Sequence, residues 1–150
     1  MLRITKLTDY AIVVLTHMAG PEKDVPRTTR GIATRTRIPQ PTVSKILKDL
    51  TRGNLVVSQR GAQGGYRLAR ASEEIKLVHI IDAVEGHVGL TECSGEEPAT
   101  CDFAGSCPLE ANWIRINHVV RRALTGISLA DMTRPLAPPL IRLSRRTASA

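Results

Sequence analysis

Three cysteines are the residues whose type and spacing most clearly indicate chemistry in this sequence. Cys93, Cys101 and Cys107 are separated by seven and five residues, and Pro108 follows the last of them. Thiolates are soft ligands that suit iron–sulfur clusters or zinc. Zinc sites usually contain cysteine pairs separated by about two to four residues, whereas clusters tolerate wider loops. The spacing therefore favours an iron–sulfur cluster and leaves zinc or metal-free thiols as alternatives.

The compartment bears on this choice, because disulfide frameworks belong to oxidising environments. Asp9, Thr16 and His17 interrupt the apolar run near the N-terminus, no small-residue cleavage site follows it, and no run is long enough to span a membrane. We therefore expect a cytoplasmic protein without a membrane partner. An odd number of cysteines there favours metal or redox chemistry. A disulfide switch would need easily ionised thiols, which the acidic surroundings oppose.

The cysteines lie in a segment without hydrophobic periodicity, residues 87–107, which we call the cysteine loop. The first predicted helix lies near the N-terminus, well before the cysteine loop in the sequence. Thr8 is its expected N-cap, and Gly20 and Pro21 are expected to end it. Its apolar positions follow helical spacing: Ala11, Val14, Leu15 and Met18. A second predicted helix runs from Ser72, followed by two glutamates, to Gly86. The loop is thus expected to follow one helix and precede another.

Residues 30–68 predict a winged helix-turn-helix. A short helix over 30–36 is followed by a better one that Pro41 opens, with an inward stripe formed by Val43, Ile46, Leu47 and Leu50. Residues 55–58 and 66–68 read as strands on either side of a glycine-rich loop. Two helices followed by a hairpin make a helix-turn-helix with a wing.

The charge distribution suits double-stranded DNA as the partner. Residues 1–70 hold 13 Lys and Arg against 4 Asp and Glu, whereas residues 71–110 hold 1 against 9. A major groove about 12 Å wide admits one helix. The helix that Pro41 opens is therefore expected to reach base edges with the polar side chains Gln40, Thr42, Ser44 and Lys45. Arg60 suits a narrow minor groove, and Lys48 and Arg67 are candidate phosphate contacts. The alternative is a basic surface that is merely solvated.

A further helix is predicted after Pro108. Its apolar residues step by three or four and form a seam typical of a helix that needs a partner: Leu109, Trp113, Ile116, Val120, Leu124 and Ile127. The seam predicts a homodimer, whose operator should be an inverted repeat. The expected fold is mainly α with a small β-hairpin wing. It divides into a DNA-binding domain over 1–86, the cysteine loop over 87–107, a dimerisation helix over 108–132 and a flexible basic tail over 133–150.

An enzyme is not expected, because the sequence shows no nucleophile paired with a base, no phosphate loop and no paired carboxylates with a cleft to hold them. Two readings remain for a DNA-binding protein with these cysteines. One is a regulator that senses a cluster. The alternative is a zinc-bound or thiol–disulfide redox-switched repressor without a cluster.

Three segments resemble the IscR/NsrR type of regulator: LRITKLTDYA at residues 2–11, RGAQGGYRL at 60–68 and IIDAVEG at 80–86. Together with the cysteines, the resemblance covers residues 1–133 and is greatest to regulators of the SUF iron–sulfur assembly system. It implies a homodimeric winged-helix repressor or activator that senses iron–sulfur cluster, redox or nitric oxide status. Genes of cluster assembly are the implied targets.

The same resemblance implies that Cys93, Cys101 and Cys107 ligate a [2Fe-2S] or [4Fe-4S] cluster. The sequence departs from the pattern at Glu110, where the iron–sulfur-cluster regulator has histidine. In resembling regulators without that histidine, an aspartate matching Asp9 ligates the cluster from the other subunit, which makes Asp9 the first candidate and Glu110 the second. Asp9 also has an ordinary role, since an acid in the first turn stabilises a helix dipole.

Overall fold

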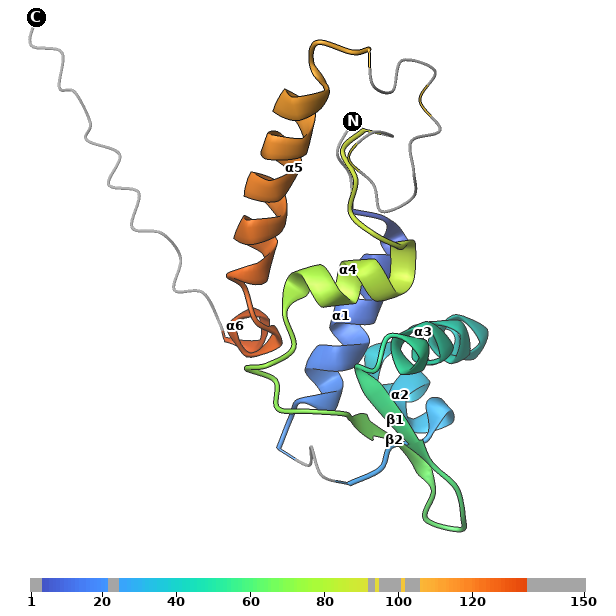
Figure 1. Ribbon diagram of the computed structural model, residues 1–150. Coiled ribbons are helices and arrows are strands. Elements are labelled where there is room, and N and C mark those ends of the chain that lie inside the picture. The colour runs from blue at the N-terminus through green and yellow to red at the C-terminus, as the bar shows by residue number, and fades with distance from the viewer. Residues whose placement is uncertain (1–3, 22–24, 92–93, 95–100, 102–105, 135–150) are drawn as a thin grey trace, which may run out of the picture.

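The protein is described by a computed structural model, which covers residues 4–21, 25–91, 94, 101 and 106–134 (Figure 1). Its elements follow in the order α1 (Lys6–Met18), α2 (Thr29–Thr36), α3 (Gln40–Arg52), β1 (Val56–Gln59), β2 (Gly65–Leu68), α4 (Leu77–Glu85), α5 (Glu110–Thr125) and α6 (Leu129–Thr133). This is the expected mainly helical fold with a two-stranded wing. None of the helices in these ranges is long and apolar enough to cross a bilayer. Cys93 lies outside the described residues, and so does the part of the predicted tail that follows Arg134.

Helix α1 passes through the core, and its predicted apolar stripe is fully buried. Its start differs from the prediction, because the N-cap is Thr5 and not Thr8. The hydroxyl of Thr5 accepts a hydrogen bond from the backbone N–H of Thr8 at 3.3 Å, and Thr8 is itself buried inside the helix. The carboxylate of Glu85, at the end of α4, accepts a hydrogen bond from the Thr5 backbone N–H at 3.1 Å. This long-range contact fixes the earlier start.

Helices α2 and α3 form the predicted helix-turn-helix. The turn between them has Arg37 in a left-handed conformation, and the buried Ile38 follows. The inward stripe of α3 is completely buried, as expected, and α3 ends at Arg52. Gly53 caps it where α4 approaches so closely that a Cβ atom would lie 2.6 Å from that of Ala83. The stop signal predicted at Gly53 therefore also allows two helices to pack together.

Strands β1 and β2 pair in antiparallel register, with Val56 opposite Leu68 and Gln59 opposite Gly65. Arg27, which precedes α2, extends this ladder, because its backbone exchanges two hydrogen bonds of 2.9 Å with Tyr66. A Cβ atom on Gly65 would lie 2.8 Å from the Arg27 backbone. The wing is therefore fastened to the start of the helix-turn-helix.

Helix α4 begins at Leu77, so the predicted start at Ser72 is wrong. Lys76 is extended because it forms an antiparallel bridge with Ser128, which precedes α6. The Leu77 N–H donates to the Ile127 carbonyl at 2.9 Å, and the Leu129 N–H donates to the Ile75 carbonyl at 2.8 Å. Backbone pairing with a segment 50 residues away in the sequence overrides the local helix signal.

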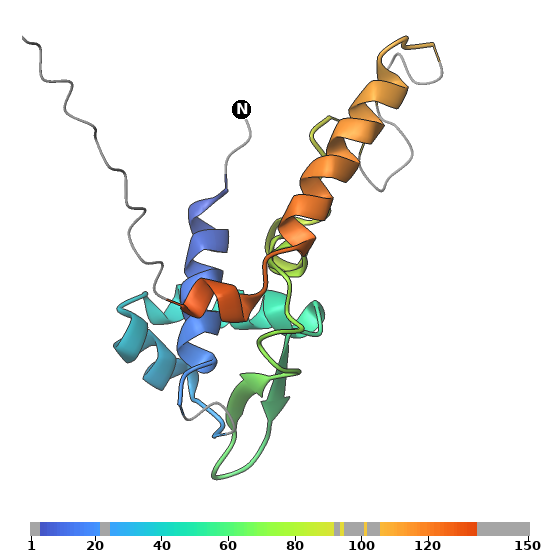
Figure 2. The ribbon, with the colours of Figure 1, turned by 90° about the vertical axis from the view of Figure 1, so that its left-hand side faces the viewer.

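The single helix predicted over 108–132 is two helices, because α5 ends at Gly126. Ser128 then caps α6, its hydroxyl accepting from the Asp131 N–H at 3.2 Å while the Asp131 carboxylate accepts from the Ser128 N–H at 2.9 Å. Leu129 is fully buried in the same core as α1. Figure 2 shows α5 rising away from the helix-turn-helix while α6 lies across α1. Burial of Leu129 is the physical reason for the break.

Candidate DNA interface and cysteine loop

The outward face of α3 presents the side chains expected to meet DNA. Gln40, Ser44, Lys45 and Lys48 are exposed and Thr42 is half-buried. The Ser44 hydroxyl donates to the Gln40 carbonyl at 3.0 Å, which leaves its lone pairs as acceptors. Buried apolar residues on the opposite face hold α3 in place. These side chains therefore project from one rigid helix.

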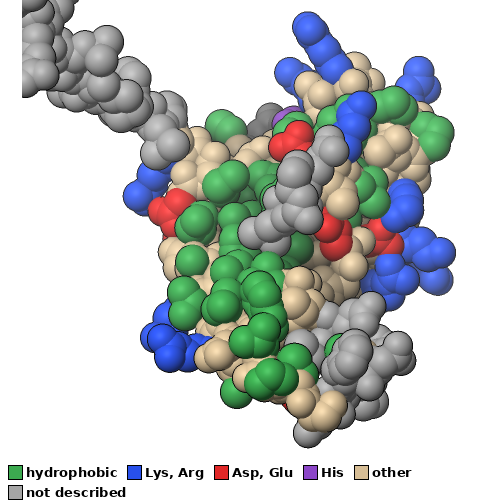
Figure 3. All heavy atoms as spheres, turned by 90° about the horizontal axis from the view of Figure 1, so that it is seen from above, with side chains coloured by type: hydrophobic (Ala, Val, Ile, Leu, Met, Phe, Trp, Pro, Cys, Tyr) green, Lys and Arg blue, Asp and Glu red, His purple; other side chains and the backbone are tan. Residues whose placement is uncertain are grey.

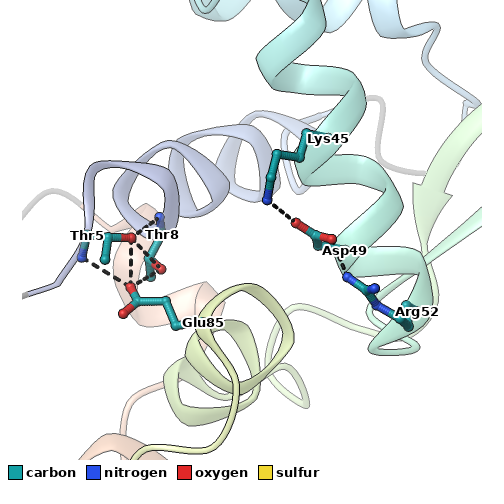
Figure 4. A network of polar contacts seen from close by, with 6 residues as sticks. All are labelled: Thr5, Thr8, Lys45, Asp49, Arg52 and Glu85. Atoms are coloured by element: carbon teal, nitrogen blue, oxygen red, sulfur yellow. Dashed lines mark hydrogen bonds and ion pairs between the residues drawn. The ribbon is translucent and has the colours of Figure 1, made fainter.

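A buried carboxylate lies among the cations of α3, a feature that the sequence analysis missed. Asp49 is only 6% exposed, and it forms ion pairs with Lys45 at 3.0 Å and with Arg52 (Figure 4). The spacing of three and four residues is the signal that could have revealed these pairs. Two of the basic side chains of α3 are thus bound within the protein.

An open groove of about 520 Å³ lies between α3 and the hairpin. We call it the wing groove, and it is lined by Ser44, Lys48, Thr51, Arg52, Ser58 and Tyr66. Every lining side chain carries a hydroxyl or a positive charge, and none carries a carboxylate. Such a donor set suits a phosphate oxygen. Lys48 was expected to contact phosphate, whereas the other lining residues apart from Ser44 were not identified from the sequence.

The two predicted arginines of the wing are placed differently. Arg60 follows β1 directly and is exposed in the loop at the end of the hairpin. Arg67 pairs with Val57, one position along from the Ser58–Tyr66 pair that lines the wing groove. Because neighbouring residues of a strand point to opposite faces, Arg67 lies on the other side of the hairpin from the groove. The structure therefore does not bring Arg67 together with Lys48.

The predicted ligands of the cysteine loop do not converge within the described part of one chain. Cys101 and Cys107 are partly buried free thiols, and Asp9 is exposed in the first turn of α1. In the ranges that the structure covers, no three His, Cys, Asp or Glu side chains are grouped to hold a metal ion. The donor chemistry of two thiols and a third cysteine nearby in the sequence nevertheless fits an iron–sulfur cluster.

The beginning of the cysteine loop is fastened to α4 and α5. The guanidinium of Arg121 on α5 donates two hydrogen bonds to Asp82 on α4, at 3.0 and 2.9 Å. Asp82 also accepts a hydrogen bond from the backbone N–H of Val88 at 3.1 Å. Burial raises the pKa of Asp82, but the bonds from Arg121 and Val88 outweigh burial and hold that pKa below its ordinary value.

A second fastening point lies beside Cys93 in the sequence. Asn117 on α5 is buried, and its side-chain amide donates to the carbonyl of Ser94 at 3.1 Å. The Ser94 hydroxyl donates to the Thr91 carbonyl at 2.9 Å, which closes a tight turn. Neither Asp82 nor Asn117 was identified from the sequence, because their partners are distant in the chain.

The start of α1, which carries Asp9, is fixed from α4. The Glu85 carboxylate accepts hydrogen bonds from the Thr5 hydroxyl at 2.9 Å and from the Thr8 hydroxyl (Figure 4). Burial raises the pKa of Glu85, but these bonds outweigh it and lower the pKa overall. The end of α4 therefore positions the first turn of α1 as well as the start of the cysteine loop.

Helix α5 exposes an apolar band that contains part of the predicted seam. Trp113, Ile116 and Val119 are 38%, 44% and 64% exposed, whereas Val120 and Leu124 are half-buried. Asn117 and Arg121 point toward the loop and α4, which turns Val119 outward in place of Val120. Figure 3, seen from the end where α5 begins, shows hydrophobic side chains gathered on this side of the molecule. We call Trp113, Ile116 and Val119 the apolar band, which does not include Ile114, also exposed on α5.

Comparison with known sequences identifies a family of similar proteins. Residues 4–135 match the model of the Rrf2 family, described as an iron-dependent transcriptional regulator. A protein of Azotobacter vinelandii that is named as an HTH-type transcriptional regulator, ORF2, is 32% identical, and the match covers 97% of this chain and 88% of that protein. The HTH-type transcriptional regulator NsrR of Halalkalibacterium halodurans is 30% identical over 83% of this chain and 81% of its own length.

Solved structures show the same fold. IscR of T. potens superposes with a TM-score of 0.63 at 27% identity, over 87% of this chain and 85% of that one. CymR of Staphylococcus aureus, in a structure described as its oxidized form, also gives a TM-score of 0.63, at 25% identity over 91% of this chain and 99% of that one.

Proposed function

Because the chain belongs to the Rrf2 family of transcriptional regulators, we propose that it is a homodimer whose binding to DNA follows the state of an iron–sulfur cluster in the cysteine loop. DNA binding and transcriptional regulation come with the family, and the protein is not an enzyme. The proposal adds the dimer, the cluster and the coupling between them. Genes of iron–sulfur cluster assembly are the proposed targets, on the strength of the resemblance to regulators of that system.

The proposed DNA contacts start from the outward face of α3. Gln40, Thr42 and Ser44 meet base edges, and Lys48 meets a phosphate held in the wing groove. Arg60 reaches from the hairpin loop to a minor groove. Lys45 remains a proposed base contact, although Asp49 binds it in the structure. Arg67 has less support as a phosphate contact, because it faces away from the groove.

The proposed dimer forms through the apolar band of α5. Three large apolar side chains in a row on an exposed helix are typical of an interaction surface. A second copy of the chain presents the same band, so the contact would be symmetric. Two α3 helices related by this symmetry would meet an inverted-repeat operator, with half-sites about one helical turn or a multiple apart.

The proposed cluster ligands are Cys93, Cys101 and Cys107 with Asp9 of the partner subunit. Asp9 supports this assignment because it is exposed on a helix start that Glu85 holds rigid. Three cysteines leave one ligand position of the cluster open, which a residue of a second chain can fill. When bound, the cluster supplies iron that reacts with oxidants or nitric oxide. Glu110 is the local alternative to Asp9.

The observation that carries the coupling is the triple role of Asp82. Its carboxylate holds Arg121 of α5 and the Val88 N–H at the start of the cysteine loop, while its own helix packs on α3. A change in the loop that moves Val88 would therefore act on α4 and α5 together. A movement of α4 would affect DNA binding through α3, on which it packs. A movement of α5 would affect DNA binding through the proposed dimer interface.

A thiol-based or zinc-bound regulator is the second candidate. It is favoured by the likeness to a neighbour that has an oxidized form, and by the free thiols of Cys101 and Cys107. In that case DNA binding would follow disulfide formation or zinc occupancy, and no iron would be needed.

Anaerobic purification separates the candidates. The cluster proposal expects iron and inorganic sulfide in the protein, visible absorption, and DNA binding that changes when the cluster is removed. Asp9→Ala should shorten cluster lifetime, whereas Glu110→Ala should leave it unchanged if the ligand comes from the partner subunit. Zinc without iron, or DNA binding that responds only to thiol oxidants, would instead support the second candidate.

A further inference from the structure

Asp49 is the buried ionisable side chain among the residues that the structure describes, and the proposed contacts to DNA do not use it. A carboxylate removed from water is costly unless cations compensate it. Lys45 and Arg52 do so, from positions four residues before and three residues after it. Their own side chains remain 60% and 70% exposed. The charged groups of two surface cations are thus drawn to a buried anion on the helix that reads DNA.

The position of this cluster matters because α3 has only one other cation within its length. Lys48 lies between Lys45 and Arg52 in the sequence and lines the wing groove, and no described residue forms an ion pair with it. Lys48 is therefore available to any phosphate. The ion pairs of Lys45 and Arg52 with Asp49 must break, at least in part, before these two cations can fully neutralise DNA phosphates.

We propose that Asp49 is a specificity-determining residue, which holds Lys45 and Arg52 in competition with DNA. Phosphates are the same on every sequence, so competition from Asp49 weakens binding to all duplexes. Well-placed base acceptors, such as O6 and N7 of guanine, are present only on the right sequence and compensate the loss there. Asp49 thereby increases the ratio of the affinity for the operator to the affinity for other DNA. This inference rests on DNA reading by α3, and it adds a residue that does not itself touch DNA.

A purely structural role gives a different expectation. If Asp49 only stabilises α3, its replacement lowers stability but leaves the dependence of binding on salt unchanged. If Asp49 withholds cations, its replacement frees them to neutralise phosphates and release counterions. Each neutralised phosphate steepens the log–log dependence of the binding constant on salt by about 0.9.

The test uses Asp49→Asn in the full-length protein, because asparagine keeps the shape and removes the charge. The probes are a duplex that the parent protein selects from a random-sequence pool and a scrambled duplex of the same composition. We expect about three- to tenfold tighter binding to the scrambled duplex, a smaller gain on the selected one, and a salt dependence steeper by about 1 to 2. Adding Lys45→Met should cancel about half of the added slope.

The matched control is Asp131→Asn, which makes the same change in net charge at another ion-paired acid, on α6. It should leave the salt dependence unchanged. A folded Asp49→Asn protein with unchanged salt dependence and unchanged selectivity would overturn the proposal, as would a shallower dependence. If that variant does not melt cooperatively, Asp49→Ser takes its place with the same expectations. A parent protein that selects no duplex at all would instead overturn DNA reading by α3.

Discussion

The recognition helix and the cysteine loop are positioned in different ways. Every proposed base contact stands on α3, which one chain builds completely and anchors through a buried apolar stripe. In the cysteine loop, the described polar contacts include those that Asp82 makes with Val88 and that Asn117 makes with Ser94. The proposed base contacts thus come from one helix of each chain, whereas the proposed cluster site combines residues of two chains. That difference suits a sensor, because a site shared between two chains can couple the state of the cluster to the dimer.

The largest effect should come from breaking the dimer. Replacing Ile116 and Val119 together by Asp puts charges into the apolar band, so we expect monomers by sedimentation equilibrium. Operator affinity should fall about 100-fold or more, because the two half-sites are no longer bound by one linked molecule. His118→Asp is the control, since it adds a charge on another exposed side of α5 and should leave the dimer intact. A dimeric double variant would place the interface elsewhere.

A smaller effect is expected from loosening the loop. Asn117→Ala removes the hydrogen bond to the Ser94 carbonyl, so the turn that Ser94 closes should open more often. Hydrogen exchange of the Ser94 amide should accelerate about tenfold, as for a local loss of roughly 1.4 kcal/mol. Asn112→Ala, at an exposed position of the same helix, should leave this exchange unchanged. Equal exchange in both variants would mean that the loop does not depend on α5.

The ion pair of Asp82 should contribute about 1 kcal/mol to stability in the cluster-free protein, since it is only partly shielded from water. Its pKa is lower in the folded state, so this contribution is present above the pKa of the unfolded chain, near 4. It is lost as the pH falls below that value. Denaturant unfolding should therefore show Asp82→Asn less stable than the parent at pH 7, with the gap closing at about pH 3. A gap that persists at low pH would argue against the ion pair.

The smallest effect compares two cations of the DNA-binding surface. Lys48→Ala should weaken binding to all sequences about threefold and make the salt dependence shallower by about 1, because Lys48 lines the wing groove. Arg67→Ala should change neither, because Arg67 faces the opposite side of the hairpin. Fluorescence anisotropy over a salt series measures both. An equal loss of DNA affinity in the two variants would show that lining the wing groove does not determine which cation contacts a phosphate.

Local patterns predicted the elements whose contacts are local. The stripes of α1 and α3 follow from apolar periodicity, and the hairpin follows from its glycines. The prediction failed where a distant partner decides. Glu85 moves the start of α1, and the segment around Ser128 moves the start of α4 and divides the last helix.

The same distinction holds for the site. The periodicity of α3 indicated the exposed face that carries Gln40, Ser44, Lys45 and Lys48, although Thr42 is half-buried. It did not reveal the pairing of Asp82 with Arg121 or of Asn117 with Ser94, which lie 39 and 23 residues apart in the sequence. Val119 in place of Val120 is a related case, because polar contacts of α5 set the rotation of that helix. Asp49 is an exception, because its partners are within four residues and the pairing could have been foreseen.

The packing of α6 on α1 has a consequence for how the protein is made. Leu129 belongs to the same buried core as Ala11, so this core is complete only when nearly all of the described chain has been synthesised. At about 5 to 20 residues per second, the ribosome releases α5 before α6 can dock. A nascent chain that already carried a finished DNA-reading surface could bind an operator before its partner helix existed. Because Leu129 joins the core after α5 has been synthesised, the complete core and the proposed dimerisation helix become available together.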